Sequence, residues 1–241
     1  MEYYCLSDIG LAREKNQDYY AVLKNSYGDL LAIVADGIGG GKAGEVASEE
    51  DVKYFDFIFK DCGPFSDIED IISFLSLHIS CANHHVFDLS RKYFEYAGMG
   101  TTLTGIMITE KGIISLNCGD SRVYGFLDHD MYHLTEDHTL VNMLLKEGKI
   151  TKEEAANHPK RHYLVKAIGV YETVHPDIHK VKDMDYFLVC SDGLHSFLSE
   201  EEIKEIVLDE NMTVEDKTIA LKDAALMKGG ADNITIILLK R

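Results

Sequence analysis

Four aspartates stand where apolar, strand-like stretches of the chain begin or end. Asp36, Asp120 and Asp192 each follow such a stretch, and Asp232 precedes one. Each has a small or turn-forming residue on its other side. If neighbouring strands bring these ends together, the four carboxylates meet at one edge of the fold. Converging carboxylates repel one another, so either their pKa values rise or a cation offsets their charge.

The residue types at these positions indicate which cation they would take. Carboxylate oxygens suit Mg²⁺ or Mn²⁺, and neither histidine nor cysteine occurs at these four positions. Gly37 can turn its carbonyl oxygen towards a metal ion, and Gly39–Gly41 would keep the site open to a bulky substrate. Taken singly, Asp-Gly and Asp-Ser are also ordinary turn dipeptides, and spacing alone leaves that alternative open.

The stretch VADGIGGGKAGEVAS, residues 34–48, also has the spacing of a nucleotide-binding loop. Three of its glycines match G-x-G-x-x-G after an apolar run. Asp36 counts against a dinucleotide site, because an anion would compete with the pyrophosphate there. A Rossmann fold requires helices between its successive strands, and the strands that follow this stretch have none between them. A P-loop is excluded because Ala43 stands where serine or threonine is needed.

Hydrophobic periodicity indicates strands in runs and helices in separate blocks. Apolar residues spaced by three and four from Ile68 to Leu89 predict one long helix. Short β-like stretches at 101–109, 113–118, 122–127 and 131–135 predict sequential hairpins, and therefore an antiparallel sheet. Further strands are expected at 30–35, 186–190 and 234–239, and further helices at 43–59, 199–208 and 213–228. This order predicts an α+β fold in which sheets pack together with helices outside.

The bulk composition bounds domain number, compartment and partners. The 241 residues are 46% hydrophobic and contain no linker or repeat, which predicts a single domain over 1–241. A net charge of −17 disfavours nucleic acid and anionic lipid as partners. The five cysteines are scattered without a C-x-x-C pair, so no disulfide framework is indicated. With neither a signal peptide nor a membrane-length apolar run, we expect a cytoplasmic protein, and a monomer.

In the content and order of its motifs, the chain resembles the metal-dependent serine/threonine protein phosphatases of the type 2C family, in their compact bacterial form. The resemblance covers nearly the whole chain. The matching motifs are Gly10–Asp18, Asp36–Gly40, Gly44–Ser48, Gly100–Thr102, Gly119–Arg122, Asp137–Thr139, Cys190–Leu194 and Asp232–Thr235. The resemblance implies a four-layer αββα sandwich, with two antiparallel sheets flanked by helices, and a variable flap at about 138–182 beside the active site.

The resemblance also implies a role for each metal-binding residue. Asp36 would bridge two Mn²⁺ or Mg²⁺ ions, and the Gly37 carbonyl would bind one of them. Asp192 and Asp232 would complete the other site. Asp120, together with Asp192, would build a site for a third ion.

The reaction implied by the resemblance is hydrolysis of phosphoserine or phosphothreonine in proteins. Arg13 would grip the substrate phosphate with its planar fork of donors, and Asp18 would hold metal-bound water. Two ions would activate the attacking water and offset the phosphate charge, without a covalent phosphoenzyme. The substrates would be proteins phosphorylated by serine/threonine kinases, including a cognate kinase.

Two positions depart from the family pattern. Ile38 and Gly41 stand where relatives carry a histidine that is a proposed proton donor. Water at the Asp120 site and the side chain of His138 remain as candidates for that task, and a structural role is the alternative for His138.

These departures keep a second class of function open, a pseudophosphatase that binds a phosphorylated partner without turnover.

A metal-dependent phosphodiesterase acting on nucleic acid is disfavoured by the charge of −17. His158 and His162 are four residues apart, but Pro159 argues against the helix that would align them as zinc ligands.

Overall fold

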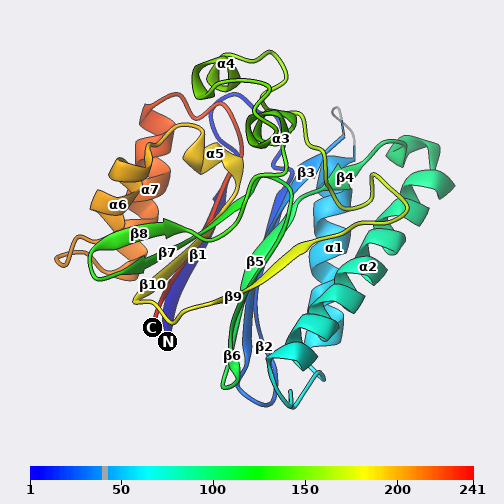
Figure 1. The fold of residues 1–241 in the computed structure, drawn as a ribbon, viewed down its shortest axis with the longest axis horizontal. Coiled ribbons are helices and arrows are strands. Elements are labelled where there is room, and N and C mark those ends of the chain that lie inside the picture. Colours follow the sequence, from blue (N-terminus) through cyan, green and yellow to red (C-terminus); the bar gives the residue numbers. More distant parts are fainter. Residues whose placement is uncertain (40–42) are drawn as a thin grey trace.

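Two antiparallel sheets packed face to face form the centre of the molecule, and helices cover both outer faces (Figure 1). The computed structural model describes residues 1–39 and 43–241. One sheet has the strand order β1 (Glu2–Asp8), β11 (Ile234–Lys240), β10 (Tyr186–Cys190), β7 (Arg122–Leu127) and β8 (Asp130–His133). The other has the order β2 (Asp18–Lys24), β3 (Leu30–Ile38), β5 (Leu103–Thr109), β6 (Gly112–Cys118) and β9 (Asp177–Val181), with β4 (Gly100–Thr101) paired to β3. The predicted four-layer α+β sandwich is confirmed.

The helices divide into two outer layers and a pair at one end of the sandwich (Figure 1). Helices α1 (Gly44–Phe59) and α2 (Ile68–Lys92) cover the sheet that contains β3, and a short 3₁₀ turn, Phe94–Tyr96, follows α2. Helices α5 (Asp192–His195), α6 (Glu200–Val207) and α7 (Val214–Met227) cover the other sheet. Helices α3 (Leu140–Lys146) and α4 (Lys152–Ala156) lie at one end of the sandwich. In the part of the chain that the structure describes, no helix has the length and apolar character needed to cross a bilayer.

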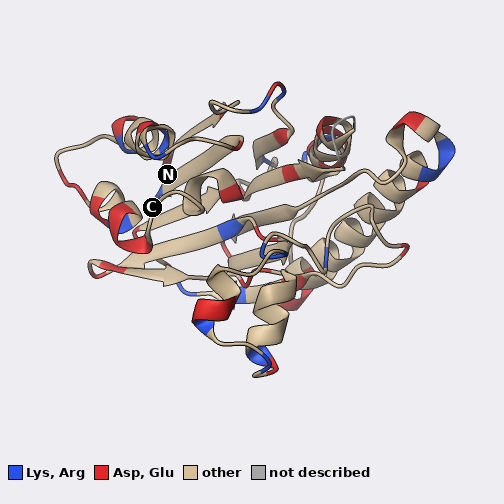
Figure 2. Cartoon of the chain, turned by 90° about the horizontal axis from the view of Figure 1, so that it is seen from above, with Lys and Arg blue, Asp and Glu red and all other residues tan. Residues whose placement is uncertain are grey.

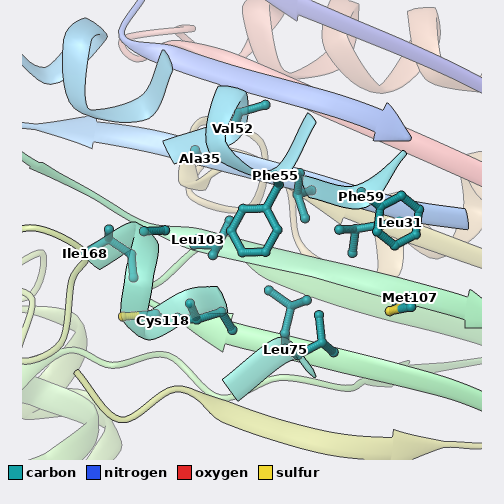
Figure 3. Close-up of a cluster of buried hydrophobic side chains, with 14 of the residues drawn as sticks. Leu31, Ala35, Val52, Phe55, Phe59, Leu75, Leu103, Met107, Cys118 and Ile168 are labelled. Atoms are coloured by element: carbon teal, nitrogen blue, oxygen red, sulfur yellow. The ribbon is translucent and has the colours of Figure 1, made fainter. Parts of the chain in front are cut away.

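The core explains why a carboxylate at the end of β3 faces the other sheet. Leu30, Ala32 and Val34 pack between the two sheets, whereas the residues between them pack under α1 and α2, in the cluster drawn in Figure 3. Side chains alternate between the two faces of a strand. Asp36 continues the even-numbered series, so it lies on the inner face, where the apolar filling between the sheets ends.

The strands that the sequence pattern did not indicate, β1, β2 and β9, all lie at sheet edges. Edge strands are partly solvated and carry charged and polar residues. Residues of these three strands are mostly half-buried or exposed, so they lack the continuous apolar run by which β3, β10 and β11 are predicted. One consequence is local to the site: Asp18 begins the unpredicted strand β2.

Candidate active site

Asp18 and Asp36 face each other across neighbouring strands. They are register partners in the antiparallel pair of β2 and β3. Like charges placed directly opposite one another in a sheet are destabilising. Burial raises the pKa of Asp36 well above its ordinary value, and the nearby Asp18, Asp192 and Asp120 raise it further. The structure therefore brings a charge conflict to the end of β3.

Three further aspartates complete a cluster that we call the carboxylate rim (Asp18, Asp36, Asp120, Asp192 and Asp232). Asp120 follows β6, Asp192 begins α5, and Asp232 precedes β11. A cavity of about 580 Å³ is lined by the last four rim residues together with Gly37 and Arg13. Residues predicted from four distant motifs thus meet at one opening. Acidic residues also occur on many other elements (Figure 2), so convergence and burial distinguish the rim, not net charge.

Asp18 lies beneath this cavity and is held by the chain segment that carries Asp192. The Ser191 hydroxyl donates to Asp18 Oδ2 at 2.7 Å and accepts from the backbone N–H of Thr235 at 2.9 Å. Burial raises the pKa of Asp18, and the charges of Asp192 and Asp232 add to that rise. Ser191 therefore ties strand β2 of one sheet to β10 and β11 of the other directly under the rim.

Two rim oxygens are buried without a hydrogen-bond partner among the described residues, Asp18 Oδ1 and Asp192 Oδ1. An unsatisfied buried carboxylate oxygen is costly unless a cation or a proton compensates it. Burial raises the pKa of Asp192 and of Asp120, and in each case a neighbouring aspartate raises it further. An oxygen-rich, anionic cavity of this kind fits a hard divalent cation such as Mg²⁺ or Mn²⁺.

The rim does not form a ready-made cage. Within residues 1–39 and 43–241, no group of three or more His, Cys, Asp or Glu side chains is arranged so that it could hold a metal ion. Asp232 Oδ2 is instead oriented towards Arg13, whose Nη2 donates to it at 2.7 Å. In this arrangement Asp232 Oδ2 is paired with a cation of the chain itself, the Arg13 guanidinium.

Arg13 is positioned by a loop that packs against the segment before β11. Gly10 has φ +76°, and a Cβ atom there would lie 2.2 Å from the carbonyl oxygen of Asp232. The Asn233 side chain donates to the backbone carbonyls of Ile9 and Lys15, at 2.9 and 3.0 Å. Both ends of the loop are thus fixed, and the guanidinium of Arg13 lies at the mouth of the cavity.

Gly37 is required by packing. A Cβ atom at Gly37 would lie 2.2 Å from the carbonyl oxygen of Gly44, so no larger residue fits between the end of β3 and the start of α1. The backbone N–H of Gly37 donates to the Gln17 carbonyl at 3.0 Å. Gly41, one of the two positions that depart from the family pattern, lies outside the described residues, whereas Ile38 lines the cavity.

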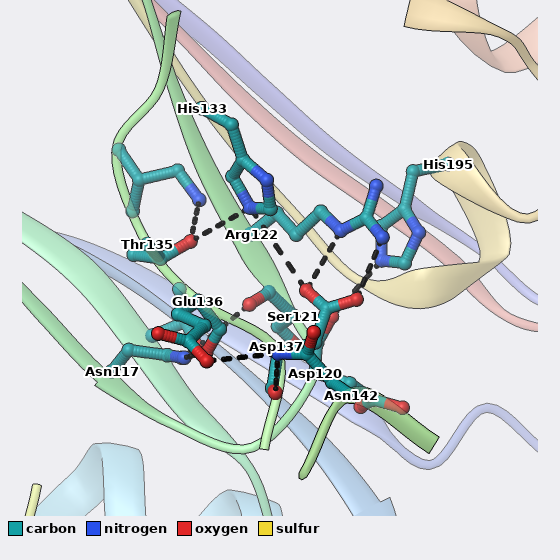
Figure 4. Close-up of polar contacts among 12 residues, drawn as sticks. Asn117, Asp120, Ser121, Arg122, His133, Thr135, Glu136, Asp137, Asn142 and His195 are labelled. Atoms are coloured by element: carbon teal, nitrogen blue, oxygen red, sulfur yellow. Dashed lines mark hydrogen bonds and ion pairs between the residues drawn. The ribbon is translucent and has the colours of Figure 1, made fainter. Parts of the chain in front are cut away.

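The start of the segment expected to form the flap is joined to the sheets by a polar network that we call the flap root (Arg122, Asp137, His138, Lys166 and Asp177). Arg122 on β7 donates to both carboxylate oxygens of Asp137, at 2.8 and 2.6 Å (Figure 4). Burial by itself would raise the pKa of Asp137, but the hydrogen bonds and charge of Arg122 lower it below the ordinary value. Above this pair, His195 Nε2 donates to the Asp120 carbonyl at 3.0 Å.

His138 has both ring nitrogens engaged in the flap root. Its Nδ1 accepts from the backbone N–H of Gly119 at 3.1 Å, and its Nε2 lies 3.1 Å from Asp177 Oδ2. Because Nδ1 accepts, the ring proton is assigned to Nε2, which donates to Asp177. His138 is buried and does not line the cavity. Of the two roles considered for it, the geometry supports the structural one, since the ring holds the Gly119–Asp120 turn.

The cavity is also lined by His162, a residue of the expected flap segment that the sequence pattern did not single out for catalysis. Its Nδ1 lies 4.0 Å from Asp192 Oδ2. In the sequence, Pro159 argued against a helix that would align His162 with His158 as zinc ligands. No local motif indicates that a loop residue such as His162 reaches the rim. A second cavity of about 740 Å³ adjoins the first, and both share Asp120, His162, Asp192 and Asp232.

Comparison with known proteins places this site in a family. Residues 12–226 match the family model described as protein phosphatase 2C. The chain is 37% identical over 237 residues to the serine/threonine phosphatase stp of Listeria monocytogenes, covering 98% of this chain and 94% of that protein. It is also 37% identical over 241 residues to protein phosphatase PhpP of Streptococcus pneumoniae, covering 99% and 96% of the two chains.

The fold comparison agrees. The crystal structure of the serine/threonine phosphatase Stp1 from Staphylococcus aureus superposes with a TM-score of 0.94 at 33% identity, covering 100% of this chain and 94% of that one. A structure of the serine/threonine phosphatase PstP/Ppp of Mycobacterium tuberculosis matches with a TM-score of 0.87 at 32% identity, covering 100% and 99%. The chain is therefore a member of the protein phosphatase 2C family, of the bacterial type.

Proposed function

We propose that this protein hydrolyses phosphoserine and phosphothreonine esters in phosphoproteins and uses Mn²⁺ or Mg²⁺ to do so. Phosphatases of this family are metal-dependent. The observation that carries the proposal is the carboxylate rim, where five aspartates converge and two buried carboxylate oxygens, Asp18 Oδ1 and Asp192 Oδ1, find no partner among the described residues. The names of the relatives, serine/threonine phosphatases, support the same chemistry.

The proposed metal ligands are the side chains of Asp36, Asp192 and Asp232 and the carbonyl oxygen of Gly37, with Asp120 contributing to a third position. When bound there, two or three divalent ions would activate water and offset the charge of the phosphate. The protein's own part is to hold these oxygens at fixed strand ends between the sheets. Asp18, fixed by Ser191, would orient the water that enters the site.

Arg13 would bind the non-bridging oxygens of the phosphate. Its guanidinium is paired with Asp232 in the structure, and both groups are needed for the proposed reaction. When Asp232 turns towards a cation, the donors of Arg13 become available to the phosphate, which a guanidinium can bind through two parallel hydrogen bonds. One rearrangement would thus prepare both the metal site and the phosphate site.

We further propose that residues 1–241 form one catalytic domain, with the segment at about 138–182 as a flap over its active site, and that the protein acts as a cytoplasmic monomer. Its substrates would be proteins phosphorylated by serine/threonine kinases, including a cognate kinase. The acidic surface, with a net charge of −17, supports a protein substrate over nucleic acid.

The experiment measures turnover of p-nitrophenyl phosphate and of a phosphothreonine peptide with Mn²⁺, with Mg²⁺ and with EDTA. We expect turnover that needs the metal and is abolished in Asp192→Asn, while circular dichroism shows an intact fold. Turnover that persists unchanged in EDTA contradicts the proposal. Phosphopeptide binding without turnover at saturating Mn²⁺ would identify a pseudophosphatase instead.

A further inference from the structure

The proposed reaction must deal with a poor leaving group. When the bond between phosphorus and a seryl or threonyl oxygen breaks, its electron pair stays on that oxygen, which becomes an alkoxide unless it is stabilised. A hydrogen-bond donor aimed at the leaving oxygen therefore lowers the barrier for alkyl phosphates. A nitrophenolate is a much weaker base and needs no such help.

Side chains that could supply this hydrogen bond are few. We call the cavity of about 580 Å³ at the carboxylate rim the catalytic cavity. Among the described residues that line it, the ones with side-chain N–H donors are Arg13, Gln17, His162 and Asn233. Arg13 is assigned to the non-bridging oxygens of the phosphate, Gln17 Nε2 donates to Glu45 at 3.1 Å, and Asn233 Nδ2 donates to two backbone carbonyls. His162 makes no hydrogen bond to the described part of the protein through its side chain. Of these four side chains, it is the one with neither a hydrogen bond nor an assigned role, so it is available to a ligand.

The position of His162 is set by backbone pairing, although it belongs to the flap. The Leu140 N–H donates to the Tyr163 carbonyl at 2.8 Å, and the Val165 N–H donates to the His138 carbonyl at 2.8 Å. Leu164 forms a β-bridge to Thr139 and lines the same cavity. The segment after His162 is therefore held against the flap root, so the backbone at His162 is presented at a defined place beside the cavity.

The ring of His162 faces the rim without being bound by it. The distance from Nδ1 to Asp192 Oδ2 is 4.0 Å, which is too long for a hydrogen bond. The side chain is 57% exposed, so it is not held by burial either. It lies where the catalytic cavity meets the adjoining one, which is where the rest of the substrate would leave the phosphate site.

We infer that His162 is a catalytic residue that donates a hydrogen bond to the leaving oxygen of the phosphorylated side chain. The inference rests on the proposed phosphatase function. In the step, water oxygen bonds to phosphorus while the phosphorus–oxygen bond to the substrate breaks. One proton of that water stays on the phosphate, and the other ends on the seryl or threonyl oxygen. The His162 N–H stabilises the negative charge on that oxygen as the bond breaks.

The test compares leaving groups in the full-length protein with Mn²⁺. Wild type, His162→Ala and His162→Gln are assayed on a phosphothreonine peptide, on p-nitrophenyl phosphate and on aryl phosphates of graded leaving-group basicity. We expect His162→Ala to lower kcat for the peptide by about 10²-fold and to leave kcat for p-nitrophenyl phosphate nearly unchanged. The dependence of kcat on leaving-group basicity becomes steeper in this variant. His162→Gln, which keeps an N–H donor, recovers part of the loss.

His175→Ala is the matched control, because His175 is an exposed histidine of the flap that does not line either cavity. An equal loss on all substrates in His162→Ala would assign His162 to flap positioning, and a change in KM alone would assign it to substrate docking. Either result overturns the inference while leaving the phosphatase function intact. Wild-type protein that turns over none of the substrates would remove the proposed function, and the inference with it.

Discussion

The carboxylate rim and the flap root lie next to each other and are both rich in aspartate, but their electrostatics are opposite. In the rim, Asp18 and Asp120 are buried and Asp36 and Asp192 are half-buried beside them, and the pKa of each is raised. In the flap root, Arg122 lies beside Asp137, and Lys166 and His138 lie beside Asp177. These partners overcome the effect of burial and lower the pKa of both carboxyl groups. The charges of the flap root are paired within the chain, whereas two buried oxygens of the rim have no hydrogen-bond partner among the described residues.

This difference shows how one fold separates structure from function. Buried charges that serve stability are paired and hydrogen-bonded. Buried charges that remain unpaired carry a cost that a bound cation or a proton can remove, and such groups gather at functional sites. The substitutions that follow test whether the two regions differ in this way, beginning with the largest expected effect.

Replacing a rim carboxylate should remove activity without harming the fold. We expect Asp36→Asn to lower kcat by about 10³-fold or more, because several kcal/mol of charge stabilisation by the cations depends on it. In EDTA, the same variant should unfold at an equal or higher temperature, because it relieves the repulsion across β2 and β3. Phosphatase assays and thermal unfolding in EDTA measure both. A large loss of stability would mean that the rim is not under strain.

Replacing Arg122 of the flap root should lower the stability of the fold. Arg122→Ala leaves the half-buried Asp137 without its bidentate partner, and we expect the free energy of unfolding to fall by about 2 kcal/mol. Urea denaturation measures the loss, with Arg91→Ala on the exposed side of α2 as the control. A loss no greater than that of the control would show that the pair contributes specificity and not stability.

A third buried aspartate separates burial from charge convergence. Asp51 on α1 is fully buried, neither of its oxygens has a hydrogen-bond partner in the described residues, and burial raises its pKa well above the ordinary value. It does not line the catalytic cavity. We expect Asp51→Ala to stabilise the protein at pH 7 by about 1–2 kcal/mol while leaving metal-dependent turnover unchanged.

The pH dependence of this effect has a definite sign. In the unfolded chain the Asp51 carboxyl has a pKa of ~3.9. In the folded protein burial raises that pKa, so Asp51 keeps its proton to a higher pH. The penalty of Asp51 is therefore absent below the unfolded pKa and grows as the pH rises above it. Urea denaturation at pH 4 and pH 7.5 should show a larger gain for Asp51→Ala at the higher pH. A gain independent of pH would indicate helix propensity as the cause.

Much of the fold was predictable because interior elements carry strong patterns. The apolar runs of β3, β10 and β11 and the three-four spacing of α2 reflect burial directly. The edge strands β1, β2 and β9 were not predictable in the same way, because partial exposure relaxes the pattern. For the site, the strand-end positions of Asp36, Asp120, Asp192 and Asp232 could be read from the residues, whereas Asp18 was reached only through the family motif.

The amino-acid sequence by itself determined which strands are buried on both faces and which carboxylates stand at their ends, because alternation and apolar runs are local properties. Only the tertiary structure decided that Asp18 faces Asp36, that both ring nitrogens of His138 are engaged by neighbouring groups, and that His162 reaches the rim. Each of these depends on contacts between segments far apart in the chain. The packing of two sheets and a flap fixes those contacts, and no local pattern encodes them.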